Sequence, residues 1–144
     1  MWKACLLLVL GFGACHASMD DMSSMRGYVE DTRRETTRHL DAARAALTTK
    51  DMRDEMDRHR DGMTPMMADI DMAMDGMVGH CGGDGVGEMR TMHGELDGEM
   101  AQHLAAMNAS LEVSAALAEV ERHAATMMTM MDGMDGAMSR MSCP

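Results

Sequence analysis

The chain repeats itself at an interval of 64 residues, and this feature restricts its fold more than any other. Aligned without gaps, residues 20–77 and 84–141 are identical at 19 of 58 positions, whereas composition alone gives roughly five or six identities. The Gly-rich stretch 79–87 lies between the two copies and is the expected linker. Two copies of one supersecondary unit are therefore expected to pack together.

Each copy contains two stretches whose core-type residues alternate at spacings of three and four, which is the pattern of packed helices. Strand-like alternation is absent. The sequence therefore predicts an all-α fold, a four-helix bundle made from a tandem-duplicated helical hairpin. The expected core positions are Met22, Met25, Val29, Thr32, Thr36, His39, Ala43 and Ala46; Met52, Met56, His59, Met63, Met66, Ile70, Ala73 and Met77; Val86, Met89, His93, Leu96, Met100, His103 and Met107; and Ala116, Val120, His123, Met127, Met130, Met134, Ala137 and Met141.

The turns within the copies are weakly marked. Asp51 is the expected N-cap after the first turn and Ser110 after the second. Neither turn contains Gly or Pro, so one continuous helix per copy remains an alternative to the hairpin. Pro65 is expected to kink the second helix.

The N-terminus has the pattern of a secretory signal. One Lys precedes an apolar run that is too short for a membrane span, and residues 1–14 are expected to be removed. The small residues before Cys15 resemble a lipoprotein signal, which implies a lipidated Cys15 and a membrane anchor; cleavage after Ala17 is the alternative. The remaining residues, 15–144, are expected to form one helical domain, which is periplasmic or anchored at the outer membrane.

Composition narrows the possible partners. A net charge of −11 disfavours nucleic acid and raises the local concentration of cations.

The chain has 23 Met and only three aromatic residues, so Met must replace Leu and Phe in the core. Met packs flexibly and specifies a core poorly, which makes filling space a weak reason for so much of it. Met128, Met131 and Met138 fall outside the expected core positions and are predicted to be partly exposed.

Four histidines are expected to lie in one layer. His39 precedes Thr49 by ten residues and His59 follows it by ten, so an antiparallel hairpin places them level. His103 and His123 are related in the same way to residue 113. Four imidazoles buried without partners would be costly, and a bound cation removes that cost.

A Glu stands four residues before each of these histidines: Glu35, Glu55, Glu99 and Glu119. On a helix this spacing places the carboxylate on the same face, where it can accept the second imidazole N–H, as carboxylates commonly do beside metal-binding histidines. The alternative is a surface carboxylate paired with Arg.

Copper, as Cu(I), is the favoured ion because thioethers are soft ligands and Met63, Met100 and Met127 are expected in the next layer. The other Met residues could hold additional Cu(I). Binding at the histidines is expected to weaken below about pH 6 because protons compete for the same nitrogen. In general composition the chain resembles the Met/His-rich periplasmic copper-binding proteins of bacteria, and it shares no motif that would transfer a site.

Several alternatives remain open. Zinc suits imidazole ligands, haem b suits facing histidines in a bundle, and a structural envelope lipoprotein would bind no metal. No nucleophile, phosphate loop or acid–base pair is visible, so no enzyme is predicted.

His93 is either a further ligand or an isolated core histidine. Cys81 and Cys143 follow the last helix of each copy and are expected to form a disulfide, with a thiolate copper site as the alternative.

Overall fold

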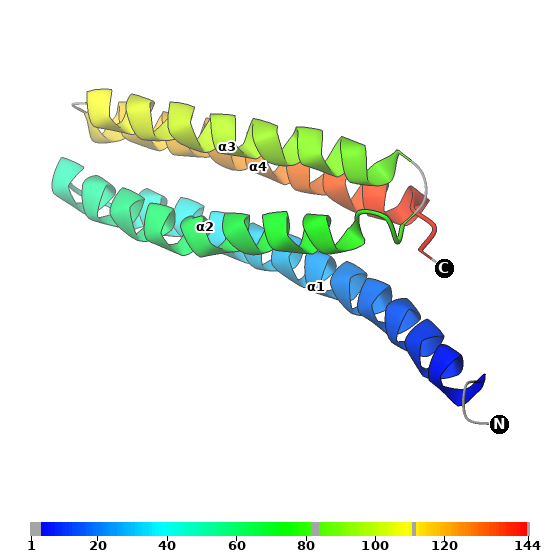
Figure 1. Ribbon diagram of the computed structural model, residues 1–144. Helices are drawn as coiled ribbons and strands as arrows, with labels where there is room; N and C mark the ends of the chain where they lie inside the picture. The colour runs from blue at the N-terminus through cyan, green and yellow to red at the C-terminus, as the bar shows by residue number, and fades with distance from the viewer. Residues whose placement is uncertain (1–3, 82–83, 111, 144) are drawn as a thin grey trace.

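The computed structural model describes residues 4–81, 84–110 and 112–143, with side chains from residue 21 onward. It contains four helices, α1 (Ala4–Ala45), α2 (Thr49–Met77), α3 (Gly85–Ala109) and α4 (Val113–Arg140). The all-α bundle predicted from the sequence is confirmed, and each copy is a hairpin of two helices rather than one continuous helix (Figure 1).

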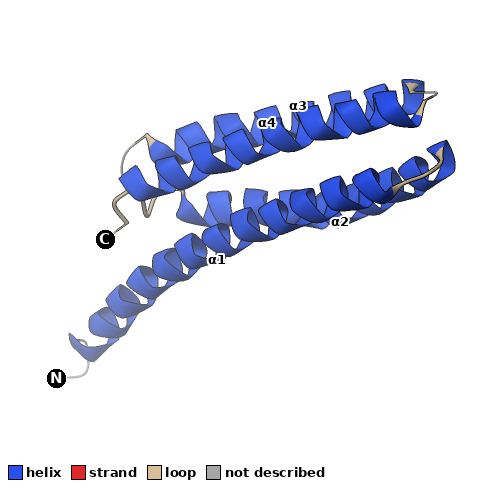
Figure 2. Ribbon diagram, turned by 180° about the vertical axis from the view of Figure 1, so that it is seen from behind, coloured by secondary structure: helices blue, strands red, loops and turns tan. Residues whose placement is uncertain are grey.

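The helices form an up-and-down bundle. α1 packs on α2 and α4, and α3 packs on α2 and α4, so the helices follow one another around the bundle in chain order. The two hairpin turns lie at one end, and the α2–α3 connection and the C-terminus lie at the other (Figure 1). The N-terminal part of α1 extends beyond the other helices, as Figure 2 shows from behind. In the described residues, no helix is long and apolar enough to cross a membrane.

The 64-residue repeat is visible in the helix boundaries. α1 ends at Ala45 and α3 at Ala109, while α2 begins at Thr49 and α4 at Val113, so both boundaries shift by 64 residues. The two turns therefore lie at equivalent places in the two copies. Residues at equal distances from a turn then lie level in both hairpins.

The helix caps differ from those predicted. Thr48, not Asp51, is the N-cap of α2, because the Thr48 hydroxyl accepts from the Asp51 amide while the Asp51 carboxylate accepts from the Thr48 amide in a capping box. Glu112, not Ser110, precedes α4, and Ser110 instead ends α3 with its hydroxyl donating to the Ala106 carbonyl.

The connection between the hairpins is shorter than the predicted linker 79–87. α3 already begins at Gly85, so residues 78–84 connect α2 to α3. Gly79 takes a φ of 85°, a conformation that favours glycine, where the chain leaves α2. α2 continues as one helix through Pro65.

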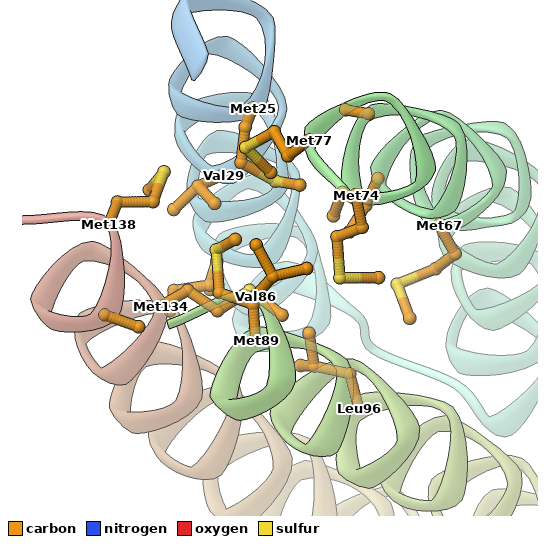
Figure 3. Close-up of a cluster of buried hydrophobic side chains, with 14 of the residues drawn as sticks. Met25, Val29, Met67, Met74, Met77, Val86, Met89, Leu96, Met134 and Met138 are labelled. Carbon is orange, nitrogen blue, oxygen red and sulfur yellow. The ribbon is translucent and has the colours of Figure 1, made fainter. Parts of the chain in front are cut away.

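The histidines divide the core into two clusters. The turn-side cluster consists of Ala43, Met52, Met56, Met107, Ala116 and Val120. The disulfide-side cluster, part of which Figure 3 shows, consists of Met25, Val29, Met63, Met67, Ile70, Ala73, Met74, Met77, Val86, Met89, Leu96, Met100, Met127, Met131, Met134, Ala137 and Met138.

In the disulfide-side cluster the core positions of α2 and α4 differ from the prediction. Met131 and Met138 are buried rather than partly exposed, whereas Met66 and Met130 are only partly buried. The reason is that an α-helix of 3.6 residues per turn drifts from a strict heptad pattern. On α2 and α4 the buried residues after the histidine therefore follow at two spacings of four, as in His123, Met127 and Met131. Only Met128 is half-buried as predicted.

A disulfide joins Cys81, just after α2, to Cys143, just after α4, at the end opposite the turns. This is the pairing predicted from the sequence, and it leaves neither thiol free for a copper site. The predicted lipidation of Cys15 concerns a side chain outside those that the structure describes.

Candidate metal centre

The four predicted histidines meet in one layer at the middle of the bundle. This histidine layer consists of His39, His59, His103 and His123, and all four residues are 0% exposed. Within each hairpin the two imidazoles stack, with ring centroids 4.0 Å apart for His39 and His59 and 3.9 Å for His103 and His123. Across the hairpins the centroids are 5.6 to 6.5 Å apart. The layer follows from the helix register, because each pair stands at equal distances from its turn.

Each imidazole is held by one of the four predicted glutamates, but the pairing differs from the prediction. His39 Nδ1 lies 3.1 Å from Glu55 Oε1, and His59 Nδ1 lies 3.1 Å from Glu35 Oε1. Each histidine thus binds the glutamate of the neighbouring helix and not the one four residues before it. A glutamate beside the core faces the seam between two helices, so its carboxylate reaches the imidazole across that seam.

The second hairpin repeats the exchange. His103 Nδ1 lies 3.1 Å from Glu119 Oε1, and His123 Nδ1 lies 2.9 Å from Glu99 Oε1. All four carboxylates are therefore bound within their own hairpin, so each hairpin holds two imidazoles in place independently of the other.

Arginines hold the outer side of the carboxylates. Arg38 donates to Glu35 and Glu55, and Arg122 donates to Glu99 and Glu119. Arg58 donates to Glu55. The glutamates therefore pair with arginines, which was the alternative role predicted for them, and also bind the layer histidines. The pattern Glu-x-x-Arg-His, which ends at His39, His59 and His123, places Arg38, Arg58 and Arg122 beside these glutamates.

The carboxylates determine which imidazole nitrogen carries the proton. An ionised carboxylate can only accept, so each Nδ1 must donate its N–H, and each Nε2 is left with a free lone pair. All four Nε2 atoms are buried and have no hydrogen-bond partner. The layer therefore places four nitrogen lone pairs without a partner inside the core. Lone pairs of this kind are what a metal ligand requires.

Burial keeps these imidazoles neutral. The pKa of His59 is lowered to about 3 by burial and then by the neighbouring His39, and the pKa of His123 is lowered to about 2 by burial and by His103. Burial also lowers the pKa values of His39 and His103. An ordinary imidazole begins to bind protons at a pH of about 6. In the folded protein, protons therefore compete for Nε2 only at a lower pH than this.

Two of the glutamates, in contrast, are stabilised in their charged form. The hydrogen bond from Arg122 lowers the pKa of Glu119 to about 2. Burial raises the pKa of Glu35, but hydrogen bonds from Arg38 and His59 outweigh it, so the pKa is lowered overall. At His59 and His103 a neutral imidazole thus faces an ionised carboxylate, which is the arrangement found around metal-ligating histidines.

The layer is close in size to a metal site with four histidines. An ion about 2.0 Å from each Nε2 lies about 3.2 Å from each ring centroid, so four imidazoles placed tetrahedrally around it have centroids about 5.2 Å apart. The observed centroids lie on either side of this value, 3.9 and 4.0 Å apart within the hairpins and 5.6 to 6.5 Å apart across them. In the part of the chain that the structure describes, however, no three His, Cys, Asp or Glu side chains already converge on one ion. Binding therefore requires the stacked rings in each hairpin to open toward the centre.

A haem fits this layer poorly. A porphyrin between two facing imidazoles would have to displace the other two, because all four ring centroids lie within 6.5 Å of one another. The large disulfide-side cluster then closes the core on one side of the layer. Packing thus favours a single ion over a macrocycle.

Met63, Met100 and Met127, the predicted completing ligands, are all buried in the disulfide-side cluster that adjoins the layer. Met63 and Met127 follow His59 and His123 by four residues on the same helices. They supply thioethers beside the layer, and their coordination remains a prediction.

His93 is not part of the layer. Its Nε2 donates to the Met67 carbonyl at 3.1 Å, and its Nδ1 lies 3.2 Å from the Asp71 carboxylate. Both nitrogens therefore face oxygen acceptors, so His93 is an isolated core histidine and the further-ligand alternative does not hold.

The chain was compared with protein-family models, curated proteins and solved structures, and none of them matches it.

Proposed function

We propose that this protein binds a metal ion through the Nε2 atoms of the histidine layer, and that the ion is Cu(I). The observation that carries the proposal is the set of four buried Nε2 atoms without a partner. Each unsatisfied buried polar group costs about 1–3 kcal/mol. Four of them together cost on the order of 4–12 kcal/mol, which is comparable with the whole stability of a small domain. A bound cation offsets that cost, whereas a purely structural role leaves it without compensation.

The distribution of Met favours a soft ion. Met supplies 11 of the 17 residues of the disulfide-side cluster, and six of its eight partly buried neighbours are also Met. In the turn-side cluster it supplies three of six, and none of the five partly buried neighbours. If Met only filled space, both sides of the layer would use it alike. Thioethers gathered on one side of four imidazoles favour Cu(I) over zinc, which does not prefer thioether ligands.

The biological role that follows is sequestration or storage of copper outside the cytoplasm. Export rests on the N-terminal signal pattern, and anchoring rests on Cys15. The charge of −11 attracts cations to the protein. The proposal includes no catalytic step and no nucleic acid.

An anaerobic Cu(I) titration tests the proposal. The variant with all four layer histidines changed to Gln retains amide donors for the glutamates but removes the imidazole ligands. We expect it to lose the tight site and retain weaker Cu(I) binding by thioethers. The matched control is His93→Gln, which removes a buried histidine outside the layer and should leave the tight site unchanged. If the quadruple variant binds Cu(I) as tightly as the parent, the layer is only core packing; a parent that binds Zn(II) more tightly than Cu(I) would instead contradict the choice of metal.

A further inference from the structure

The histidine layer is closed to solvent. All four layer residues are 0% exposed, and the two core clusters cover the layer from both ends of the bundle. An ion must therefore enter sideways, between two helices. A groove lies next to the layer in the seam between α1 and α4.

This groove has a volume of about 210 Å³, which leaves room for several water molecules. Its inner residues are Thr36 on α1 and Ala124 on α4, which are 0% and 4% exposed. Ala124 directly follows His123 in the chain, and Thr36 lies one turn from His39. The groove thus reaches inward to the immediate neighbours of the layer.

The internal repeat shows why the groove lies on this side. Across the 64-residue shift, Thr36 corresponds to Met100 and Ala124 corresponds to Arg60. In α2 and α3 these places are therefore taken by two long side chains: Met100, which is buried, and Arg60, which is exposed and pairs with Asp57 and Asp61 of its own helix. The two copies agree in the histidines and glutamates of the layer but differ in the residues beside it.

The groove offers polar groups to a passing cation. The Thr36 hydroxyl donates to the Thr32 carbonyl, which leaves its oxygen lone pairs available at the inner end. Met128, half-buried, lines the groove as well and adds a thioether.

Ion pairs between α1 and α4 flank the groove. Arg44 pairs with Glu121 at 3.1 Å on the side of the turns. Arg33 pairs with Asp132 and Asp135, both at 2.7 Å, on the other side. These pairs connect the two helices on both sides of the groove, and Glu121 of the first pair also lines it.

We propose that the groove between α1 and α4 is the entry port through which the metal ion reaches the histidine layer, with Thr36 and Ala124 as the residues that leave it open. This inference rests on the proposed function. It concerns the rate of exchange and not the affinity, because a port changes binding and release equally.

The test uses Ala125→Met, a substitution at an exposed position on the rim of the groove. Met is a good helix former, so the fold should tolerate the change. The matched control is Ala101→Met, an exposed position that corresponds by the repeat to Thr37, another rim residue, and lies on α3, away from the port. Cu(I)-loaded proteins are mixed anaerobically with excess bathocuproine disulfonate, and release is followed by absorbance.

We expect Ala125→Met to release Cu(I) about tenfold more slowly than the parent, the factor that an added barrier of about 1.4 kcal/mol produces. Its equilibrium Cu(I) affinity should stay the same, and Ala101→Met should behave like the parent. Thr36→Met, which introduces the residue of the other copy, should slow release as well. Release from Ala125→Met at the parental rate, or equal slowing by Ala101→Met, overturns the port while leaving the proposed function intact. A parent that takes up no Cu(I) at equilibrium overturns both.

Discussion

The metal-free protein should lose stability as the pH falls below 6.5, earlier than carboxylates alone would cause. The folded pKa values of His59 and His123 are lowered to about 3 and about 2, whereas an unfolded histidine titrates near 6.5. Below pH 6.5 the unfolded chain therefore binds protons that the folded chain does not, and the equilibrium shifts toward unfolding. This loss continues until the pH reaches the folded pKa.

The magnitude is large for a domain of this size. Each such histidine contributes about 1.4 kcal/mol per pH unit inside this window, so His59 and His123 together remove about 5 kcal/mol between pH 6.5 and pH 4.5. A small domain has a free energy of unfolding of about 5–15 kcal/mol, so this loss is a large part of the total stability. Glu35 and Glu119, whose folded pKa values are also lowered, add to the loss only as the pH falls below their ordinary value of 4.5.

Urea unfolding followed by circular dichroism measures this free energy at pH 7.5, 6.5, 5.5 and 4.5, with EDTA present and the disulfide intact. The control is the variant with Gln at all four layer positions, which keeps the glutamates but has no imidazole to titrate in the layer. It should lose little stability above pH 4.5. A parent whose free energy of unfolding is the same at pH 7.5 and pH 4.5 would show that the histidines are not buried as neutral groups, and the argument for free Nε2 lone pairs would fail with it.

Two further predictions concern stability at neutral pH. Changing Cys81 and Cys143 to Ser should lower the free energy of unfolding by about 4 kcal/mol, because the disulfide closes a loop with a sequence separation of 62; a thermal midpoint equal to that of the parent would contradict this. Thr48→Ala should cost about 1 kcal/mol because it removes the hydroxyl of the capping box, whereas Thr49→Ala, one residue later, should cost less. Equal losses in urea unfolding for the two variants would contradict the assignment of Thr48 as the N-cap.

The fold and the composition of the site were predictable because each depends on spacing. The repeat predicted two hairpins, and equal distances from the turns predicted that His39 would lie level with His59, as their centroid separation of 4.0 Å confirms. The same spacing identified the four glutamates. Spacing along a helix is a property of the sequence alone, so no knowledge of side-chain conformation was needed.

The partners of those glutamates were not predictable in the same way. Glu55 stands between α1 and α2, and whether it binds His39 or His59 depends on side-chain rotamers and on the positions of Arg38 and Arg58. The burial of Met131 was missed for a related reason, because the drift of the helix surface accumulates over several turns and cannot be read from neighbouring positions.

The exchange of glutamates between paired helices has a consequence for the origin of the protein. All four His–Glu bonds lie inside a hairpin, so one hairpin by itself holds two imidazoles together with their carboxylates. Two identical hairpins related by a twofold axis would therefore assemble the full set of imidazoles, as in a symmetric homodimer. If such a dimer were fused into one chain, the sequences of the two hairpins would no longer have to be identical. The two copies differ at Thr36 and Met100 and at Arg38 and Gln102, whereas the four histidines and four glutamates of the layer are the same in both.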